Sequence, residues 1–369
     1  MRQWPKVAMG ELFQLEKGRI GIKAATPGFF PLVTTGEEYL SHIEPHFFGD
    51  SICIPLISAT GHGHASLKRL HHIEGEFAVG SILCACVNSS PDRVVARYAY
   101  YYLSACKDSV LIPLMQGTAN MSMKVSDIAG VGIPLPPLTE QQAIVSRLDT
   151  LADKARQVNE HLDSIERDAD RLLAVRFRDA IVDAPLRPMA EVAPLVRREI
   201  AIDPQASYTE LGVRSFFKGT FQRRTMEGTD YSWQNLFSVK TGDLIFSNIM
   251  AWEQAIAIAK PEDDGCVGNH RMLTCEVNAD AAVASFLYYY FTTAEGFAKI
   301  DAASPGTAAR NKTLKAQDLM AIVVPVPSDS TQRTFDALQA KVAALKARHA
   351  TIRQANDALI PATLERVFN

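Results

Sequence analysis

The histidines and cysteines in the first quarter of the chain are the residues whose types could support metal chemistry. The sequence reads Gly-His-Gly-His at 61–64 and Cys-Ala-Cys at 84–86, and imidazoles and thiolates are the usual ligands of zinc. The common zinc spacing CxxC is absent, however, and residues two apart on a strand face the same side, as core cysteines also would. We therefore expect loop histidines, core cysteines and no bound metal. The alternative is a zinc-dependent enzyme that uses His62, His64 and either Cys84 or Cys86.

The rest of the sequence lacks the common catalytic and nucleotide-binding motifs. It contains no GxxxxGK[ST] loop, no GxGxxG following a strand, no GxSxG elbow and no HExxH helix. A methyltransferase would need a glycine-rich cofactor loop and an Asn-Pro-Pro type turn, and both are missing. We therefore expect a protein that is not an enzyme, with no catalytic residues and no cofactor of its own.

Polar and basic residues in predicted loops suggest a different chemistry, the binding of nucleic acid. Arg and Lys bind phosphates or guanine edges, and Asn can pair with adenine. For any one residue the alternative is a solvated turn, but the loops recur at matching places in both halves of the chain, which favours contact with DNA. The candidate residues are His62, His64, Lys68, Arg69, Asn120 and Lys124 in the first half, and Arg223, Arg224, Asn248, Trp252, Arg310, Asn311 and Lys312 in the second.

Length and composition bound the kind of protein. At 369 residues the chain exceeds one typical core, and its 47% apolar content is ordinary for a folded protein. No apolar segment resembles an export signal or a membrane span, so we expect a cytoplasmic protein with reduced cysteines and no membrane contact. The net charge of −3 argues against histone-like attraction to nucleic acid but permits a local basic face.

The same order of sequence features occurs twice. A tyrosine-rich segment at 98–103 matches 286–291, the corner Ile-Pro-Leu-Pro at 133–136 matches Val-Pro-Val-Pro at 324–327, and Gln141 matches Gln332. Similarity at half the chain length indicates a duplicated unit. We predict an α+β protein in which two mixed α/β blocks are each followed by a long helix. The predicted segments are a first block at 1–138, its helix at 139–184, a second block at 185–328 and its helix at 329–369.

The two helices carry apolar residues at a narrow heptad spacing. The first has Thr139 and Gln142 placed as a capping box and no Pro or Gly before Pro185, which predicts about 44 residues and roughly 65 Å. We expect Pro361 to kink or end the second helix. A narrow apolar stripe favours pairing as an antiparallel coiled coil, and the alternative is that each helix caps its own block. The predicted seam residues are Ile144, Leu148, Leu151, Val158, Leu162, Ile165, Leu172, Leu338, Val342, Leu345, Ile352 and Leu359.

The junction between the first block and its helix carries a family resemblance. The stretch IPLPPLTEQQAIVSRLDTL at 133–151 resembles the central conserved region of the specificity subunits of type I restriction–modification systems. The second copy, VPVPSDSTQRTFDAL at 324–338, departs from it: Ser-Asp-Ser stands at 328–330, and Arg333 stands where the first copy has Gln142.

The resemblance implies two target-recognition domains that each read half of a bipartite target in double-stranded DNA. It also implies that the paired helices set the gap between half-sites and hold two modification subunits, with restriction subunits joining for cleavage. S-adenosylmethionine and ATP would be bound only by those partners. The first helix region, with 7 basic and 10 acidic residues, suits a protein-binding face better than a DNA-binding one. The alternative is a stand-alone DNA-binding scaffold of another defence system without methyltransferase partners.

Overall fold

The computed structural model of the chain describes residues 4–60, 63–231, 235–306 and 312–368. The chain divides into two compact units, one formed by residues 1–163 and 349–369 and the other by residues 164–348. Each unit therefore holds one sheet-containing block together with a segment of both long helices. Among the helices of the described residues, none combines the length and the apolar character needed to cross a lipid bilayer.

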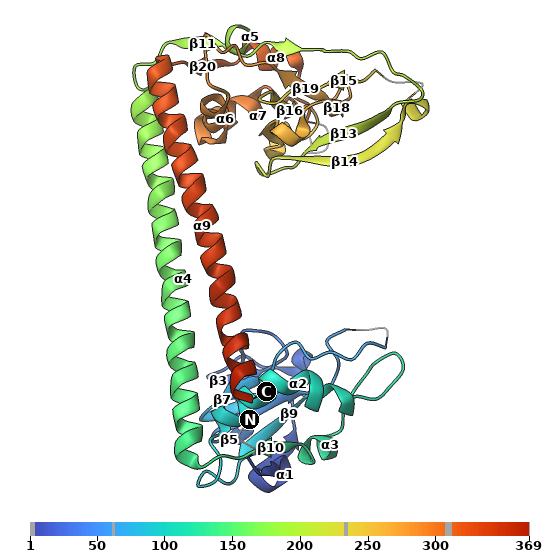
Figure 1. The fold of residues 1–369 in the computed structure, drawn as a ribbon, viewed down its shortest axis with the longest axis vertical. Coiled ribbons are helices and arrows are strands. Elements are labelled where there is room, and N and C mark those ends of the chain that lie inside the picture. Colours follow the sequence, from blue (N-terminus) through green and yellow to red (C-terminus); the bar gives the residue numbers. More distant parts are fainter. Residues whose placement is uncertain (1–3, 61–62, 232–234, 307–311, 369) are drawn as a thin grey trace. The chain divides into compact units, whose positions relative to one another are not determined.

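The first block consists of short strands, the helix α2 and several shorter helical segments. Its elements in chain order are β1 (Lys6–Ala8), α1 (Met9–Leu12), β2 (Phe13–Lys17), η1 (Ile22–Ala24), β3 (Phe30–Val33), β4 (Leu40–His42), β5 (Phe47–Phe48), β6 (Ser51–Pro55), β7 (His71–Ile73), β8 (Glu76–Val79), β9 (Leu83–Asn88), α2 (Ala96–Val110), η2 (Ile112–Leu114), α3 (Val125–Ala129) and β10 (Gly132–Pro134). The long helix α4 (Leu138–Ile181) follows directly (Figure 1).

The second block repeats this plan with small differences. Its elements are β11 (Leu186–Pro188), α5 (Met189–Val192), β12 (Leu195–Val196), β13 (Ser207–Val213), β14 (Thr220–Glu227), η3 (Gly228–Tyr231), β15 (Phe237–Ser238), β16 (Leu244–Ser247), η4 (Ala251–Glu253), β17 (Ile256–Ile258), η5 (Pro261–Asp263), β18 (Val267–Gly268), β19 (Met272–Cys275), α6 (Ala284–Thr292), α7 (Ala294–Ala302), α8 (Ala316–Ala321) and β20 (Val323–Pro325). The helix α9 (Asp329–Phe368) follows it.

The strand orders show that the blocks are copies of one fold. The first block has sheets β1-β10, β2-β9-β6-β7 and β4-β3-β8-β5, and the second has β11-β20, β12-β19-β16-β17 and β14-β13-β18-β15. In each block the third sheet contains one parallel pair, β3 with β8 and β13 with β18. The predicted α+β duplication is confirmed.

Both blocks bury apolar strands against a tyrosine-rich helix. Tyr98 on α2 and Tyr290 on α6 are fully buried, and each aromatic ring of this size removes 150–250 Å² from water. All six cysteines are free and buried. Burial raises the pKa of the Cys275 thiol to about 12, so this residue remains an uncharged core residue at neutral pH.

The segments of α4 and α9 within each unit run side by side in opposite directions (Figure 1). In the first unit Asn159 accepts a hydrogen bond from Asn356 at 3.2 Å, and Asp163 pairs with Arg353. In the second unit Asp170 pairs with Lys346 at 2.6 Å. A polar pair in an apolar seam fixes the register of a coiled coil. Helix α9 continues through Pro361 to Phe368, so the alternative that this proline ends the helix is wrong.

The buried face of α4 departs from the predicted heptad stripe. Leu148 and Leu162 are buried, as predicted. Val158 and Leu172, however, are 39% and 43% exposed, whereas Leu173, which is outside the stripe, is only 8% exposed. On α9, Val342 is buried, whereas Ile352 and Leu359 are 41% and 37% exposed. A straight helix has 3.6 residues per turn, so its buried face drifts by about 20° per heptad from a strict seven-residue repeat. The remaining predicted positions, Ile144, Leu151, Ile165, Leu338 and Leu345, are half-buried.

Candidate nucleic-acid interface

A buried glutamine ties the start of each long helix to its own block. In the first unit the Gln141 amide nitrogen donates to the carbonyl oxygens of Arg93 at 3.0 Å and Pro136 at 2.9 Å, and its oxygen accepts from the Val95 N–H at 2.9 Å. The side chain is fully buried. Val95 precedes α2 and has no side-chain cap of its own. Gln141 therefore satisfies one of the unpaired N–H groups at the start of this helix.

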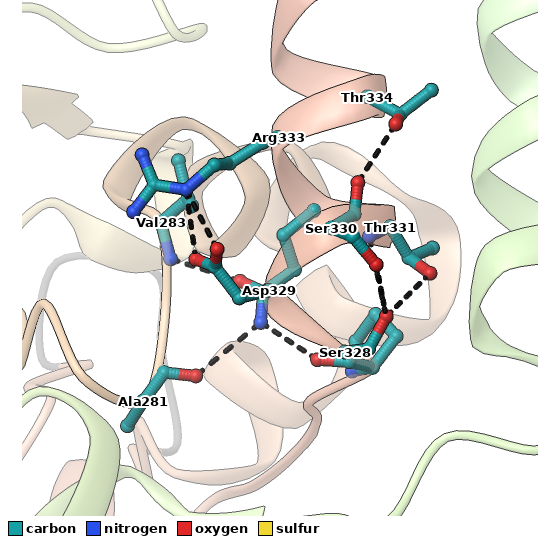
Figure 2. A network of polar contacts seen from close by, with 10 residues as sticks. Ala281, Val283, Ser328, Asp329, Ser330, Thr331, Arg333 and Thr334 are labelled. Atoms are coloured by element: carbon teal, nitrogen blue, oxygen red, sulfur yellow. Dashed lines mark hydrogen bonds and ion pairs between the residues drawn. The ribbon is translucent and has the colours of Figure 1, made fainter.

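The second unit has the same arrangement 191 positions later in the chain. Gln332 donates to the carbonyl oxygens of Ala281 at 3.3 Å and Pro327 at 2.9 Å, and accepts from the Val283 N–H at 2.8 Å. Figure 2 shows Ala281 and Val283 facing the first turn of α9.

The start of α9 is further stabilised by its own first turn. The Ser328 hydroxyl accepts from the Thr331 N–H at 3.3 Å, as an N-cap does, and Arg333 pairs with Asp329 at 2.7 Å (Figure 2). In the first copy, α4 begins at Leu138. Thr139 thus lies within the helix, and the predicted capping box with Gln142 is wrong because the preceding prolines already set the helix start. The glutamine with a structural role is Gln141, the residue before Gln142.

The far end of each long helix packs on the tyrosine-rich helix of the other block. Phe177, near the end of α4, lies 4.9 Å from Phe286 and 4.8 Å from Tyr289 between ring centroids. Phe368, at the end of α9, lies 5.6 Å from Tyr98 and 5.5 Å from Tyr102. Each unit is therefore held by a glutamine from one helix and a phenylalanine from the other. A further link joins α2 to α4, where Asp149 accepts from Arg97 and Tyr101.

The predicted candidates of the first unit lie on its surface in two neighbouring loops, which are joined by the Ile57–Ser122 bridge and by the hydrogen bond from the Ser58 N–H to the Met121 carbonyl at 2.9 Å. His64, Lys68, Asn120 and Lys124 are exposed. Arg69 is half-buried and pairs with Glu37 at 3.0 Å. His62 lies outside the described residues.

Of the residues in the alternative zinc site, those that the structure describes, His64, Cys84 and Cys86, do not come together in one site. Cys84 and Cys86 are fully buried with their sulfurs 3.8 Å apart, whereas His64 is exposed. Among the described residues, the grouping with metal-ligand geometry is instead Asp50, His72 and Glu74. The His72 ring nitrogen lies 2.7 Å from the Asp50 carboxylate, a hydrogen bond that holds edge strand β7 against the residue preceding β6.

Arg223 and Arg224 lie within strand β14 and not in a loop, which corrects the prediction. The pairing of β13 with β14 passes from Thr209–Thr225 to Leu211–Gln222, so that both arginines oppose Glu210 alone. This is a β-bulge, which redirects side chains and bends a strand. Arg224 pairs with Glu210 at 3.1 Å, which leaves the exposed Arg223 as the uncompensated charge of the pair.

The other candidates of the second unit are partly committed to structural contacts. The Asn248 N–H donates to the Arg271 carbonyl at 2.9 Å, and the Trp252 ring N–H donates to the Ile249 carbonyl at 2.9 Å. Lys312 pairs with Asp301 at 2.5 Å and lies 5.9 Å from the Trp252 ring centroid. Arg310 and Asn311 lie outside the described residues.

The structure adds a site that the sequence interpretation missed, a pocket of about 340 Å³ in the second unit. It lies between the two four-stranded sheets, and its wall includes Glu210, Gly212, Arg223, Asn269 and Arg271. Asn269 and Arg271 belong to the turn between β18 and β19. The signal in the sequence was the polar triplet Asn-His-Arg directly after a Val-Gly pair that the first block also has at 79–80.

Two arginines at the start of the second block have structural roles. Arg197 donates to the carbonyls of Met272 at 2.9 Å and His270 at 3.2 Å, and burial lowers its pKa. Arg198 forms two hydrogen bonds to Asp243 at 2.6 and 2.9 Å, and these bonds raise the pKa of its guanidinium. Both guanidinium groups are thus engaged in contacts within the second unit.

An open groove of about 890 Å³ lies between the α4 and α9 segments of the second unit. Its lining combines apolar Ala180 and Leu338 with basic Arg176, Arg333 and Lys341. A groove with such a mixed lining is better suited to binding another protein than to binding a small molecule.

The chain is similar to known DNA-specificity proteins both in sequence and in fold. Residues 1–167 match the family model described as the type I restriction modification DNA specificity domain. A search of curated proteins finds no match. The crystal structure of the HsdS subunit from Thermoanaerobacter tengcongensis is similar with 17% identity and a TM-score of 0.57, over 100% of this chain and 97% of that one. A structure described as the basis of complex assembly and conformational transition of the type I R-M system is similar with 16% identity and a TM-score of 0.63, over 100% and 98% of the two chains.

At these identities the solved structures establish the fold, and the family model matches residues 1–167. The first 167 residues of the chain are therefore similar to the type I restriction modification DNA specificity domain, and over its whole length the chain has the fold of the solved HsdS subunit.

Proposed function

We propose that this chain is the DNA-specificity subunit of a type I restriction–modification complex and that each of its units reads one half of a bipartite target. The observation that carries this proposal is the duplication: two blocks with identical strand orders, each attached to its helix by an equivalent buried glutamine. Two copies of one reading fold with different surface residues suit two half-sites of different sequence, just as paired domains elsewhere read paired half-sites.

The proposal places the chemistry on partner subunits. The chain would itself be non-catalytic, with S-adenosylmethionine and ATP bound by two modification subunits and by restriction subunits. Target bases would be flipped into the modification subunits. With a net charge of −3, this chain would depend on its partners for part of the positive surface that DNA binding requires.

The paired helices are the proposed docking surface for the modification subunits. The groove of the second unit, with its mixed apolar and basic lining, supports this. In the first unit, Val158, Ile352 and Leu359 leave apolar side chains more than a third exposed on the helix pair. Copurification distinguishes this proposal from a stand-alone scaffold: a stable complex with methyltransferase chains supports docking, whereas a chain that binds DNA without them favours the scaffold.

A block exchange tests bipartite reading. When residues 1–138 are replaced by the matching block of a relative with another specificity, we expect one half of the methylated sequence to change and the other half to remain. The exchange preserves the contacts of Gln141, because this residue binds only main-chain atoms of the transplanted block, at positions 93, 95 and 136. The donor block should also carry the counterparts of the α2 side chains that contact Asp149 and Phe368.

The reciprocal exchange of residues 185–328 is the matched control. It should change only the half-site that the first exchange leaves unaltered. If either exchange changed both half-sites, or if neither changed any, the assignment of one half-site to each unit would be wrong.

A further inference from the structure

The turn between β18 and β19 in the second unit has an unusually well-fixed main chain. Arg197 holds the carbonyls of His270 and Met272, the Asn248 N–H holds the carbonyl of Arg271, and the Asn269 side chain accepts the Arg271 N–H at 2.9 Å. The Met272 N–H closes the turn on the Asn269 carbonyl at 3.0 Å. Rigid support of this kind positions a recognition side chain without an ordering cost at the moment of binding.

The side chains on this turn, in contrast to its main chain, are available. His270 and Arg271 are exposed. Within the described part of the chain, neither Arg271 nor Arg223 forms a salt bridge, and both line the same 340 Å³ pocket. The nearby Glu210 is already paired with Arg224. The pocket therefore presents two guanidinium groups, while Glu210, the one carboxylate in its described lining, is paired with Arg224.

The equivalent turn of the first unit shows that this feature is not required by the fold. That turn lies between β8 and β9 and consists of Gly80, Ser81 and Ile82. The Leu83 N–H closes it on the Gly80 carbonyl at 2.9 Å. Counted from the Val-Gly pair that both blocks share, only Ser81 and Ile82 precede the next strand here, against Asn269, His270 and Arg271 in the second unit. The basic turn thus distinguishes the second unit from the first. Such a difference is expected of residues that set sequence preference, because the two units would read different half-sites.

We propose that Arg271 reads a guanine edge in the half-site of the second unit, while Arg223 holds a neighbouring backbone phosphate. The inference rests on the proposed function, because it assigns residues to the DNA reading suggested there. A guanidinium matches the two acceptors of guanine in the major groove, O6 and N7, with two parallel hydrogen bonds. Arg271 has the fixed main chain that such geometry needs, whereas Arg223 projects from a strand bulge, where a less directional contact to phosphate suffices.

The test is selection of bound duplexes from a randomised DNA pool by the full chain, together with its modification subunits where they copurify. The unaltered chain should select a guanine at one position of one half-site. In Arg271→Ala the preference at that position should fall by roughly 5- to 150-fold, with the other positions and the other half-site unchanged. Arg271→Lys keeps the charge but not the geometry of two parallel hydrogen bonds, so it should lose the same preference.

Arg223→Ala should weaken binding to all sequences alike and reduce the salt dependence of binding by about one charge.

Arg93→Ala removes the same charge from an exposed position outside both long helices and outside the candidate DNA-binding residues. It is the matched control, with the selection of the unaltered chain expected. The inference is overturned if Arg271→Ala keeps every base preference, or if it weakens all sequences equally. Failure of this inference can be distinguished from failure of the proposed function. If the unaltered chain selects a two-part sequence that Arg271→Ala leaves intact, only this inference fails. If the unaltered chain selects no two-part sequence, the proposed function fails with it.

Discussion

Replacing Phe177 by alanine is expected to lower the free energy of unfolding of the second unit by about 3–5 kcal/mol. The ring is 2% exposed and packs between α6 and α9, with Phe286, Tyr289 and Phe335 at centroid distances of 4.9, 4.8 and 5.2 Å. Removing it leaves a cavity among three aromatic rings, which close packing cannot refill without moving both helices. Urea denaturation of the full chain, with hydrogen exchange of α6 amides to identify the second unit, measures the effect.

Leu172→Ala on the same helix is the matched control. This residue belongs to the heptad stripe but is 43% exposed, so the change should alter the free energy of unfolding by no more than about 0.5 kcal/mol. An effect of Leu172→Ala equal to or larger than that of Phe177→Ala would mean that the heptad stripe, and not the face seen in the structure, is the packed one.

Replacing Gln141 by alanine is expected to destabilise the first unit by about 2–4 kcal/mol, because three buried main-chain groups lose their partner at once. These are the Val95 N–H and the carbonyls of Arg93 and Pro136. Gln332→Ala should have a similar effect on the second unit through Ala281, Val283 and Pro327. Urea denaturation with hydrogen exchange of α2 and α6 amides assigns each loss to its unit.

The neighbouring Gln142 is the control for this prediction, since it has the same side chain but is exposed. Gln142→Ala should leave the free energy of unfolding within about 0.5 kcal/mol of the original. Because Gln141 and Gln332 share no partners, the losses in the double variant should add. A small effect of Gln141→Ala would show that the helix start is held by its prolines alone.

The long helices and the duplication could be predicted because they leave local and repeated signals. Forty-four residues without Pro or Gly predict an uninterrupted helix, and the Pro-rich corners at 133–136 and 324–327 mark both helix starts. The pairing of Gln141 with Gln332 in the repeat is also visible in the sequence. Their role was not, because a single glutamine does not reveal that its partners are main-chain groups of a loop some fifty residues away.

The details of the buried face could not be predicted from spacing alone. The heptad stripe includes Val158 and Leu172, but a straight helix turns slightly less per residue than a strict heptad repeat requires. The residues one position later, Asn159 and Leu173, therefore reach the buried side. Arg223 and Arg224 resemble loop residues because a run of polar residues interrupts the alternation of a strand. A bulge permits that run within β14.

The candidate interface was predicted in outline only. The sequence indicates which loops carry polar groups, yet Arg69 and Lys312 turn out to be held in ion pairs with Glu37 and Asp301. Arg271 was missed because its importance depends on two contacts from distant residues, Arg197 and Asn248, that fix the main chain around it. Long-range contacts of this kind leave no periodic signal.

Mapping of methylated bases tests the central claim most directly. DNA would be sequenced for modified bases from a host that expresses this chain with modification subunits of the same organism, and from a host that expresses those subunits alone. Two reading units in one chain predict methylation only when this chain is present, in a motif of two short specified segments separated by a gap of fixed length and free sequence. A single uninterrupted motif, or the same methylation without this chain, would contradict the account.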